Sequence, residues 1–299
     1  MARFGRVVTA MVTPFDETGA LDLDAARRLA RWLQDHGNDG LVIAGTTGEA
    51  PVLTDDERLS LFAAVVEAVT IPVIAGTGTN DTLHSIHMTK EATALGVAGV
   101  LVVTPYYNRP SQAGIAAHMK AVAASTKLPV VMYDIPVRSG RKISTSTIVD
   151  LATDVPNIVA LKDAAGNPGE TASVVANAPV DFEIYSGDDS LTLPLLSIGA
   201  TGVIGVATHW SAPEHQIMFD RWESGDTAGA RRVNQALLPS FAYETGDDAP
   251  NPIPSKVMMN HLGVPVGECR LPMGPPPAFV AERAAKVRAD LAARRTEGI

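Results

Sequence analysis

The chain has 299 residues, 46% hydrophobic and 19% charged, which supplies enough apolar residues for a large core and excludes extended disorder. Its 24 basic and 33 acidic residues give a formal net charge of −9, whereas binding to nucleic acid or an anionic membrane surface favours the opposite sign. The single cysteine, Cys269, and a longest apolar stretch at 94–103, shorter than the ~18 residues of a membrane span, predict a cytoplasmic protein without disulfides.

Short apolar runs alternate with helix-like segments through the first two thirds of the chain. The runs lack the polar alternation of half-exposed strands, which is typical of parallel strands covered on both faces. They lie at Arg6–Val12, Gly40–Ala44, Pro72–Ala75, Gly99–Val103, Pro129–Tyr133, Ile158–Lys162, Phe182–Tyr185 and Gly202–Val206. Helices are predicted between them, among others at Asp24–His36, Asp55–Val69, Asp81–Leu95, Ser111–Ala124 and Thr145–Ala152.

Eight such runs, each followed by a helix, predict a (β/α)8 TIM barrel in preference to an open doubly wound sheet. After about Pro213 the strand-like runs stop. The remaining segments, Ala212–Trp222, Thr227–Tyr243, Ser255–Leu262 and Pro277–Arg295, are typical of helices. We therefore divide the chain into a catalytic TIM barrel over residues 1–225 and a C-terminal helical extension over residues 226–299.

Lys162 ends the sixth apolar run, at the strand end where a barrel of this kind carries its reactive groups. The other six lysines, Lys256 among them, fall in helical segments or loops, where a solvated ammonium is expected. At an apolar barrel mouth an amine is partly desolvated, which favours the neutral form that attacks carbonyls and forms Schiff bases. The alternative is a structural lysine paired with Asp163 or another carboxylate.

Tyr133 ends the preceding run, so its hydroxyl should lie close to Lys162 if sequential strands are neighbours. A phenol in this place can transfer protons, although an isolated tyrosine in a pocket wall is the commoner case. The loop that follows offers Arg138, whose guanidinium suits a carboxylate above the barrel mouth. The same arginine also fits a solvated basic loop.

Gly45-Thr46-Thr47-Gly48-Glu49 follows the second run and brings two hydroxyls and a flexible backbone to the same rim. Such a glycine pair by itself is most often a turn. The glycine-rich segments lack both the ending of a phosphate-binding P-loop and the third glycine of a dinucleotide site, so no organic cofactor is predicted. His84 and His87 share a helical face without a carboxylate at zinc-enzyme spacing, and no metal is predicted.

Five motifs together resemble the dihydrodipicolinate synthase family of pyruvate-dependent Schiff-base lyases in order and spacing. They are Gly45-Thr46-Thr47-Gly48-Glu49, Thr104-Pro105-Tyr106-Tyr107-Asn108, Tyr133-Asp134-Ile135-Pro136-Val137-Arg138-Ser139-Gly140, Leu161-Lys162-Asp163-Ala164 and Ser186-Gly187-Asp188-Asp189. The resemblance extends from about Arg6 to about Met273. Each motif alone is weak, but five in order are specific for this group of lyases.

The resemblance implies an enzyme that condenses pyruvate with L-aspartate 4-semialdehyde to give 4-hydroxy-tetrahydrodipicolinate, for the synthesis of diaminopimelate and lysine. Lys162 would hold pyruvate as a Schiff base, and its enamine would attack the aldehyde. Tyr133 would transfer protons during Schiff-base formation and cyclisation. Thr46 would link Tyr133 to Tyr107 of a neighbouring subunit.

The remaining substrate contacts are also implied by the resemblance. Thr47 and the backbone around Ile204 would hold the pyruvate carboxylate. Arg138 would receive the carboxylate of the semialdehyde, and Gly187 would shape the same pocket. No metal or organic cofactor is needed because the imine stabilises the developing carbanion. The shared tyrosine requires at least a dimer, and the family suggests a homotetramer built as a dimer of dimers.

The chain departs from the family at two places. Lysine-inhibited members bind lysine between subunits through histidines and a glutamate; the matching positions here are Ala50, Pro51, Asp55, Arg58, Asn80, His84 and Tyr106. Arg58 and His84 cannot accept an ammonium as the usual groups do, so we expect lysine to inhibit weakly or not at all. The tail from Met273 onwards matches the family poorly and is assigned no function beyond packing or assembly.

Two other functions are open at this point. One is a related aldolase on the same scaffold, an N-acetylneuraminate lyase or a 2-keto-3-deoxy sugar acid aldolase. These enzymes usually lack an arginine at the position of Arg138, because their second substrate is a polyol aldehyde. The other is a non-catalytic binding protein on the same barrel, which is expected to have lost Lys162 or Tyr133.

Overall fold

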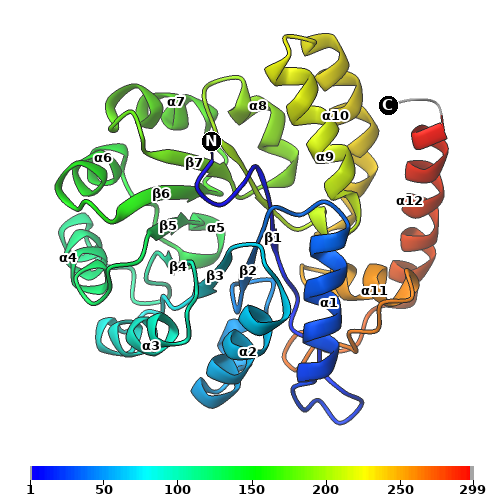
Figure 1. The fold of residues 1–299 in the computed structure, drawn as a ribbon, viewed down its shortest axis with the longest axis horizontal. Coiled ribbons are helices and arrows are strands. Elements are labelled where there is room, and N and C mark those ends of the chain that lie inside the picture. The colour runs from blue at the N-terminus through cyan, green and yellow to red at the C-terminus, as the bar shows by residue number, and fades with distance from the viewer. Residues whose placement is uncertain (1, 297–299) are drawn as a thin grey trace.

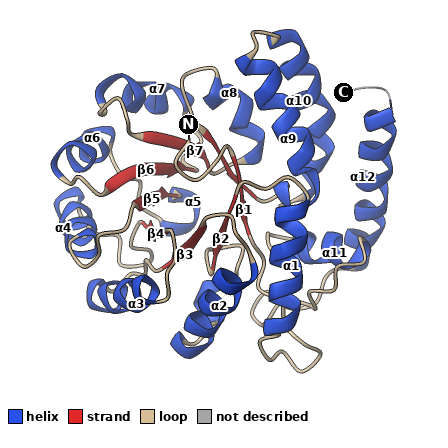
Figure 2. Ribbon diagram, viewed as in Figure 1, coloured by secondary structure: helices blue, strands red, loops and turns tan. Residues whose placement is uncertain are grey.

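Eight parallel strands close into a barrel in the computed structural model, which describes residues 2–296 (Figures 1 and 2). They are β1 (Val7–Ala10), β2 (Gly40–Ile43), β3 (Val73–Gly76), β4 (Gly99–Val103), β5 (Val130–Asp134), β6 (Ile158–Asp163), β7 (Glu183–Ser186) and β8 (Gly202–Gly205). Each strand pairs with its neighbours in sequence, and β8 returns to β1, where Val8 is opposite Ile204. The TIM barrel predicted from the sequence is confirmed.

Helices connect successive strands and surround the barrel, as Figure 1 shows. They are α1 (Leu23–Asp35), α2 (Asp55–Ala68), α3 (Thr82–Ala94), α4 (Gln112–Ala123), α5 (Pro136–Ser139), α6 (Thr145–Asp154), α7 (Pro168–Asn177), α8 (Thr192–Leu196) and α9 (Thr208–Glu223), with short 3-10 turns η1 (Ala50–Val52) and η2 (Asp189–Leu191). Local sequence determines where several of them begin. The Thr54 hydroxyl accepts a hydrogen bond from the Glu57 N–H, and the Glu57 carboxylate accepts one from the Thr54 N–H.

Strand residues alternate between two apolar cores, which explains why the strands read as continuously hydrophobic. On β5, Val131 and Tyr133 belong to the core inside the barrel, whereas Val130 and Met132 pack against the surrounding helices. The same alternation on β6 puts Ala160 inside and Leu161 outside. Since side chains two residues apart share a face, Lys162 follows Ala160 toward the barrel interior.

The C-terminal extension consists of α10 (Thr227–Tyr243), α11 (Ile253–His261) and α12 (Ala278–Thr296), which lie together on one side of the barrel (Figure 1). A separate apolar cluster joins them to α9, with Met218, Val233, Met258 and Leu291 among its members. The division of the chain at residue 225 stays a prediction. Within residues 2–296, no helix has both the length and the apolar character to cross a membrane.

Lys256, on α11, is 1% exposed, so the expectation of a solvated ammonium was wrong. Its Nζ lies 2.7 Å from Glu49 Oε1, donates to the Glu268 carbonyl at 2.8 Å and lies 4.1 Å from the centre of the Phe15 ring. The helical pattern around Lys256 does not reveal that the segment folds back against the β2–α2 loop. Because Glu49 closes the loop that carries Thr46, the extension anchors one wall of the barrel mouth.

Candidate active site

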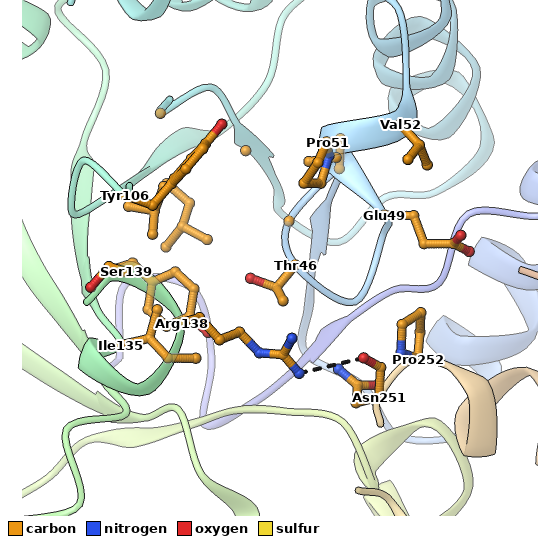
Figure 3. A pocket seen from close by; sticks show the side chains of 18 of the residues that line it. Thr46, Glu49, Pro51, Val52, Tyr106, Ile135, Arg138, Ser139, Asn251 and Pro252 are labelled. Atoms are coloured by element: carbon orange, nitrogen blue, oxygen red, sulfur yellow. Dashed lines mark hydrogen bonds between the residues drawn. The ribbon is translucent and has the colours of Figure 1, made fainter. Parts of the chain in front are cut away.

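A cavity of about 410 Å³ opens at the C-terminal ends of the strands (Figure 3). Its lining includes Thr46 from the loop after β2, Tyr106 from the loop after β4, Tyr133 from β5 and Arg138 from α5. The C-terminal extension adds Asn251, just before α11. The volume is in the range of sites for small molecules, roughly 300–1,000 Å³.

Lys162 and Tyr133 lie directly opposite each other on neighbouring strands, as predicted. The Lys162 amine sits 4.4 Å from the centre of the Tyr133 ring, and each residue is 4% exposed. Tyr133 lines the cavity, and the amine of Lys162 lies over the ring of that tyrosine. The parallel register therefore places an amine and a phenol together at the barrel mouth.

The Lys162 amine is buried without a close anion. Among residues 2–296, no carboxylate oxygen lies within 4.0 Å of it. Asp163, the partner considered from the sequence, instead accepts hydrogen bonds from the Thr171 hydroxyl at 2.6 Å and the Ala165 N–H at 2.9 Å. Burial lowers the pKa of Lys162 to about 8, while the more distant charges of Asp189 and Glu244 oppose this shift.

The Tyr133 hydroxyl is held as a neutral phenol. Burial raises its pKa to about 12, and the hydrogen bond with Thr46 and the charge of Arg138 only partly oppose that effect. A neutral phenol can both donate and accept a hydrogen bond, which suits a group that relays protons. Thr46, whose side chain points into the cavity in Figure 3, is the hydroxyl that the family resemblance implies as a partner of Tyr133.

Asn251 connects two of the predicted substrate-binding residues. Its Nδ2 donates to the Thr47 hydroxyl at 2.8 Å. Its backbone carbonyl accepts a hydrogen bond from Arg138 Nη2 at 3.4 Å, which Figure 3 shows. Thr47 is buried beneath this contact, whereas Arg138 borders the open cavity. Sequence reasoning missed Asn251, because no local signal shows that the chain returns to the barrel mouth 204 residues after Thr47.

Gly187 and Ile204 lie next to the Lys162–Tyr133 pair and are not among the residues that line the cavity. A Cβ atom at Gly187 would come within 3.0 Å of Lys162 Cγ and 3.1 Å of Lys162 Cε, so the glycine leaves room for the lysine side chain. Ile204 is buried on β8 in the same inner apolar core as Tyr133. Both residues therefore belong to the surroundings of the Lys162–Tyr133 pair.

Tyr107 lies at the edge of the cavity, where it is one of the lining residues but remains largely open to solvent. It is 89% exposed and adopts a left-handed backbone with φ of 71°, which is uncommon for a bulky side chain. No hydrogen bond of its hydroxyl occurs within the described part of this subunit. Its link to Thr46 is therefore not made within one chain.

The family was identified by comparison with known proteins. The model of the dihydrodipicolinate synthetase family matches residues 3–293. The 4-hydroxy-tetrahydrodipicolinate synthase of Moorella thermoacetica is 49% identical over 275 residues, which cover 91% of this chain and 92% of that enzyme. The chain belongs to the dihydrodipicolinate synthetase family.

Other members of the dihydrodipicolinate synthetase family agree in sequence and in structure. The 4-hydroxy-tetrahydrodipicolinate synthase of Bacillus subtilis is 46% identical, over 91% of this chain and 94% of that enzyme. A crystal structure of a dihydrodipicolinate synthase from Bacillus anthracis superposes with a TM-score of 0.92 at 41% identity, over 98% of this chain and 99% of that chain. The structure of the enzyme from Cyanidioschyzon merolae with lysine bound gives a TM-score of 0.95, also at 41% identity, over 98% of this chain and 99% of that chain.

Membership of the dihydrodipicolinate synthetase family decides between the functions left open by the sequence. The curated relatives named above are 4-hydroxy-tetrahydrodipicolinate synthases, which are lyases. This supports synthase activity over the sugar-acid aldolase and makes the protein an enzyme of lysine and diaminopimelate biosynthesis. The TIM barrel, the buried lysine and the adjacent phenol are consistent with that chemistry.

Proposed function

We propose that Lys162 forms a Schiff base with pyruvate and that the resulting enamine attacks L-aspartate 4-semialdehyde to give 4-hydroxy-tetrahydrodipicolinate. One observation carries the proposal: a buried amine without a carboxylate partner within 4.0 Å, among residues 2–296, lies over the ring of a cavity-lining phenol. With a pKa of about 8, roughly one tenth of Lys162 is neutral at pH 7. That fraction supplies the nucleophile.

Tyr133 is the proton-transfer group in this proposal. The neutral amine adds to the keto carbon, and the carbinolamine that forms must lose its oxygen as water. Tyr133 donates the proton that this step needs and then regains a proton through Thr46. Loss of a proton from the pyruvate methyl group then gives the enamine, with the iminium as electron sink.

Two anionic substrates must bind to a protein with a net charge of −9, so the site needs local positive charge. Arg138 borders the cavity and is our candidate for the semialdehyde carboxylate. For the pyruvate carboxylate we propose Thr47 with the backbone around Ile204. Gly187 keeps the space beside Lys162 open. The proposed reaction uses no metal or organic cofactor.

The assembly is proposed to be at least a dimer. Two features of Tyr107, its exposed side chain and its left-handed backbone, support this proposal. In a dimer its hydroxyl would reach Thr46 of the neighbouring subunit and complete the proton relay. A homotetramer formed as a dimer of such dimers, acting in the cytoplasm, stays our prediction. Sedimentation velocity measures the assembly directly.

Borohydride trapping tests the proposed function. Incubation with pyruvate and sodium borohydride should attach one three-carbon unit, and peptide mapping should place it on Lys162. Lys256 serves as an internal control, because it is equally buried but paired, and should stay unmodified. Absence of an adduct on Lys162 would refute the proposal. Turnover with L-aspartate 4-semialdehyde should exceed that with N-acetylmannosamine or glyceraldehyde.

Weak or absent inhibition by lysine is a further prediction. Arg58 is buried in the wall of the cavity and donates to the Ala50 carbonyl at 2.7 Å, and its positive charge repels an ammonium. The Asp55 carboxylate is already 2.9 Å from His84 Nε2. Steady-state rates should therefore change little in millimolar lysine, and a sub-millimolar inhibition constant would contradict this prediction.

A further inference from the structure

Two buried carboxyl groups lie close to each other at the barrel rim near Lys162. Asp189 is fully buried on η2, and Glu244 is buried directly after α10. Each accepts a backbone hydrogen bond from the residues that follow β8: Val206 N–H donates to Asp189 Oδ2 at 2.7 Å, and Ala207 N–H donates to Glu244 Oε2 at 2.9 Å. Neighbouring backbone donors thus hold both carboxyl groups in place.

The two backbone donors, Val206 and Ala207, are consecutive residues, which brings the carboxyl groups of Asp189 and Glu244 together, and the two side chains interact through a hydrogen bond. Two carboxylates have only acceptors, so this bond requires one shared proton and leaves the pair with a single negative charge. Burial raises the pKa of both groups, and the charge of Asp189 raises that of Glu244 further, which favours the proton on Glu244.

His215, on α9, also faces the pair, and its interaction with Asp189 partly opposes the rise that burial causes in the pKa of Asp189. Its Nδ1 donates to the Ser211 carbonyl at 2.8 Å, which leaves Nε2 directed at Asp189 Oδ1. The separation of 3.7 Å exceeds a hydrogen bond, and neither atom has another partner within residues 2–296. Asp188 is the other charged group that acts on both carboxyl groups, and it is also acidic.

The pair is near enough to Lys162 to act on its charge but does not bind the amine. Gly187, two residues before Asp189, lies against the Lys162 side chain, so the loop that carries Asp189 passes beside the lysine. Within residues 2–296, the charged or titratable groups that face Lys162 are Tyr133, Arg138, Asp189 and Glu244, of which the last two carry carboxyl groups. A direct ion pair would hold the ammonium protonated, whereas a more distant anion leaves the lone pair free.

We propose that the Asp189–Glu244 pair, with its one shared proton, is the buried counter-ion of the cationic Schiff base on Lys162. When the neutral amine condenses with the keto group, one proton is taken up and one water molecule leaves. A positive charge therefore appears on the iminium nitrogen inside an apolar barrel. A fixed negative charge favours that cation. Asp189 and Glu244 are positioning residues here, because they act through the lysine, and the inference rests on the Schiff base proposed above.

Matched variants separate charge from hydrogen bonding. Glu244→Gln can still accept from Ala207 and donate to Asp189, so the pair keeps one negative charge. The double variant Asp189→Asn/Glu244→Gln keeps an amide–amide hydrogen bond and loses the charge. We expect the single variant to trap pyruvate like the wild type. The double variant should need about tenfold or more pyruvate for half-maximal borohydride trapping.

The pH profile of pyruvate trapping distinguishes an electrostatic role of the Asp189–Glu244 pair from a purely structural one, because a structural role would leave the profile unchanged. Because the anion raises the proton affinity of Lys162, its removal should shift the profile of pyruvate capture to lower pH. A double variant that is folded by circular dichroism and shows the wild-type profile would overturn the inference. Failure of the wild type to trap pyruvate on Lys162 would instead overturn the proposed function.

A second measurement needs only the wild type and the single variant, in case the double variant does not fold. The shared proton predicts an infrared C=O stretch of a protonated carboxyl group at neutral pH. That band should disappear in Glu244→Gln. If the wild type lacks it, or if the single variant retains it unchanged, the pair does not hold its proton on Glu244 and the inference fails.

Discussion

Two lysines of this chain are buried to nearly the same extent in opposite surroundings. Lys162, 4% exposed at the barrel mouth, has no carboxylate within 4.0 Å among residues 2–296. Lys256, 1% exposed in the C-terminal extension, is 2.7 Å from the Glu49 carboxylate and donates to the Glu268 carbonyl. Burial by itself therefore does not make a lysine a nucleophile. Burial lowers the pKa of both amines, but Glu49 opposes that shift at Lys256 from contact distance. We propose that Lys162, which lacks such an anion, is the lysine that loses its proton and reacts.

The region around Lys256 supports the site from outside the barrel. Glu49 also accepts a hydrogen bond from the Arg270 N–H at 2.9 Å, and the Arg270 guanidinium pairs with Glu57. The Phe15 ring contacts both cations, with its centre 4.1 Å from the Lys256 amine and 4.2 Å from the Arg270 guanidinium. Because Glu49 closes the loop of Thr46, this ion-pair cluster fixes the loop, while we propose that the unpaired Lys162 provides the chemistry.

Substitution of the unpaired lysine should have the largest effect on turnover. Lys162→Met removes the covalent route, and we expect the condensation rate to fall by about 10³-fold or more. The fold should be retained, because the variant replaces a buried amine that has no ion-pair partner with an apolar side chain. Parallel measurements of turnover and of urea denaturation check this. A variant that keeps a tenth of the wild-type rate would contradict the assignment.

The matching substitution of the paired lysine should have the reverse pattern. Lys256→Met leaves the Glu49 carboxylate buried without its cation, and breaking such a pair costs about 3–5 kcal/mol of unfolding free energy. Urea denaturation measures the loss. Adding Glu49→Gln should recover part of it, because the orphaned charge is then removed. If Lys256→Met is as stable as the wild type, Glu49–Lys256 is not the anchor described here.

Stability should depend on pH through Lys162. The pKa is about 8 in the folded protein and 10.5 as the ordinary value, so the unfolded chain holds more protons between these limits. The free energy of unfolding therefore rises with pH across this window, by at most about 3 kcal/mol. Below pH 8 the full cost of burying the protonated Lys162 amine is present. The difference in unfolding free energy between Lys162→Met and the wild type should shrink from pH 8 to 10. A constant difference would exclude the lowered pKa.

The barrel and its central pair followed from local sequence. Strands buried on both faces must be apolar throughout, and each lies within two residues of a predicted run. Parallel register then puts the residues that end neighbouring strands side by side, which is why Tyr133 and Lys162 could be paired from the sequence. Helices α7 and α8 were expected after the sixth and seventh runs but not located, and α5 was interpreted as a loop.

The contacts made by the C-terminal extension could not be predicted in the same way. Asn251 and Lys256 reach the loop after β2 from about 200 residues away, and the sequence near them shows only helical periodicity and prolines. The Asp189–Glu244 bond likewise joins a turn after β7 to the end of α10. Such contacts depend on how whole elements pack, which periodicity and spacing do not encode.

Tyr107→Phe should have the smallest effect on turnover, and it tests whether Tyr107 takes part in the chemical step. Its side chain is exposed on one chain, and in the proposed dimer its hydroxyl joins the relay across the subunit contact, where water can substitute for it. We expect turnover to fall less than tenfold, with sedimentation unchanged. The wild-type rate per subunit should also fall on dilution below the dissociation constant of the dimer. Trapping of pyruvate on Lys162 should persist in isolated subunits, because Lys162 and Tyr133 come from one chain. A loss as severe as that of Lys162→Met would place Tyr107 in the chemical step itself and remove the distinction between the buried pair and its exposed partner.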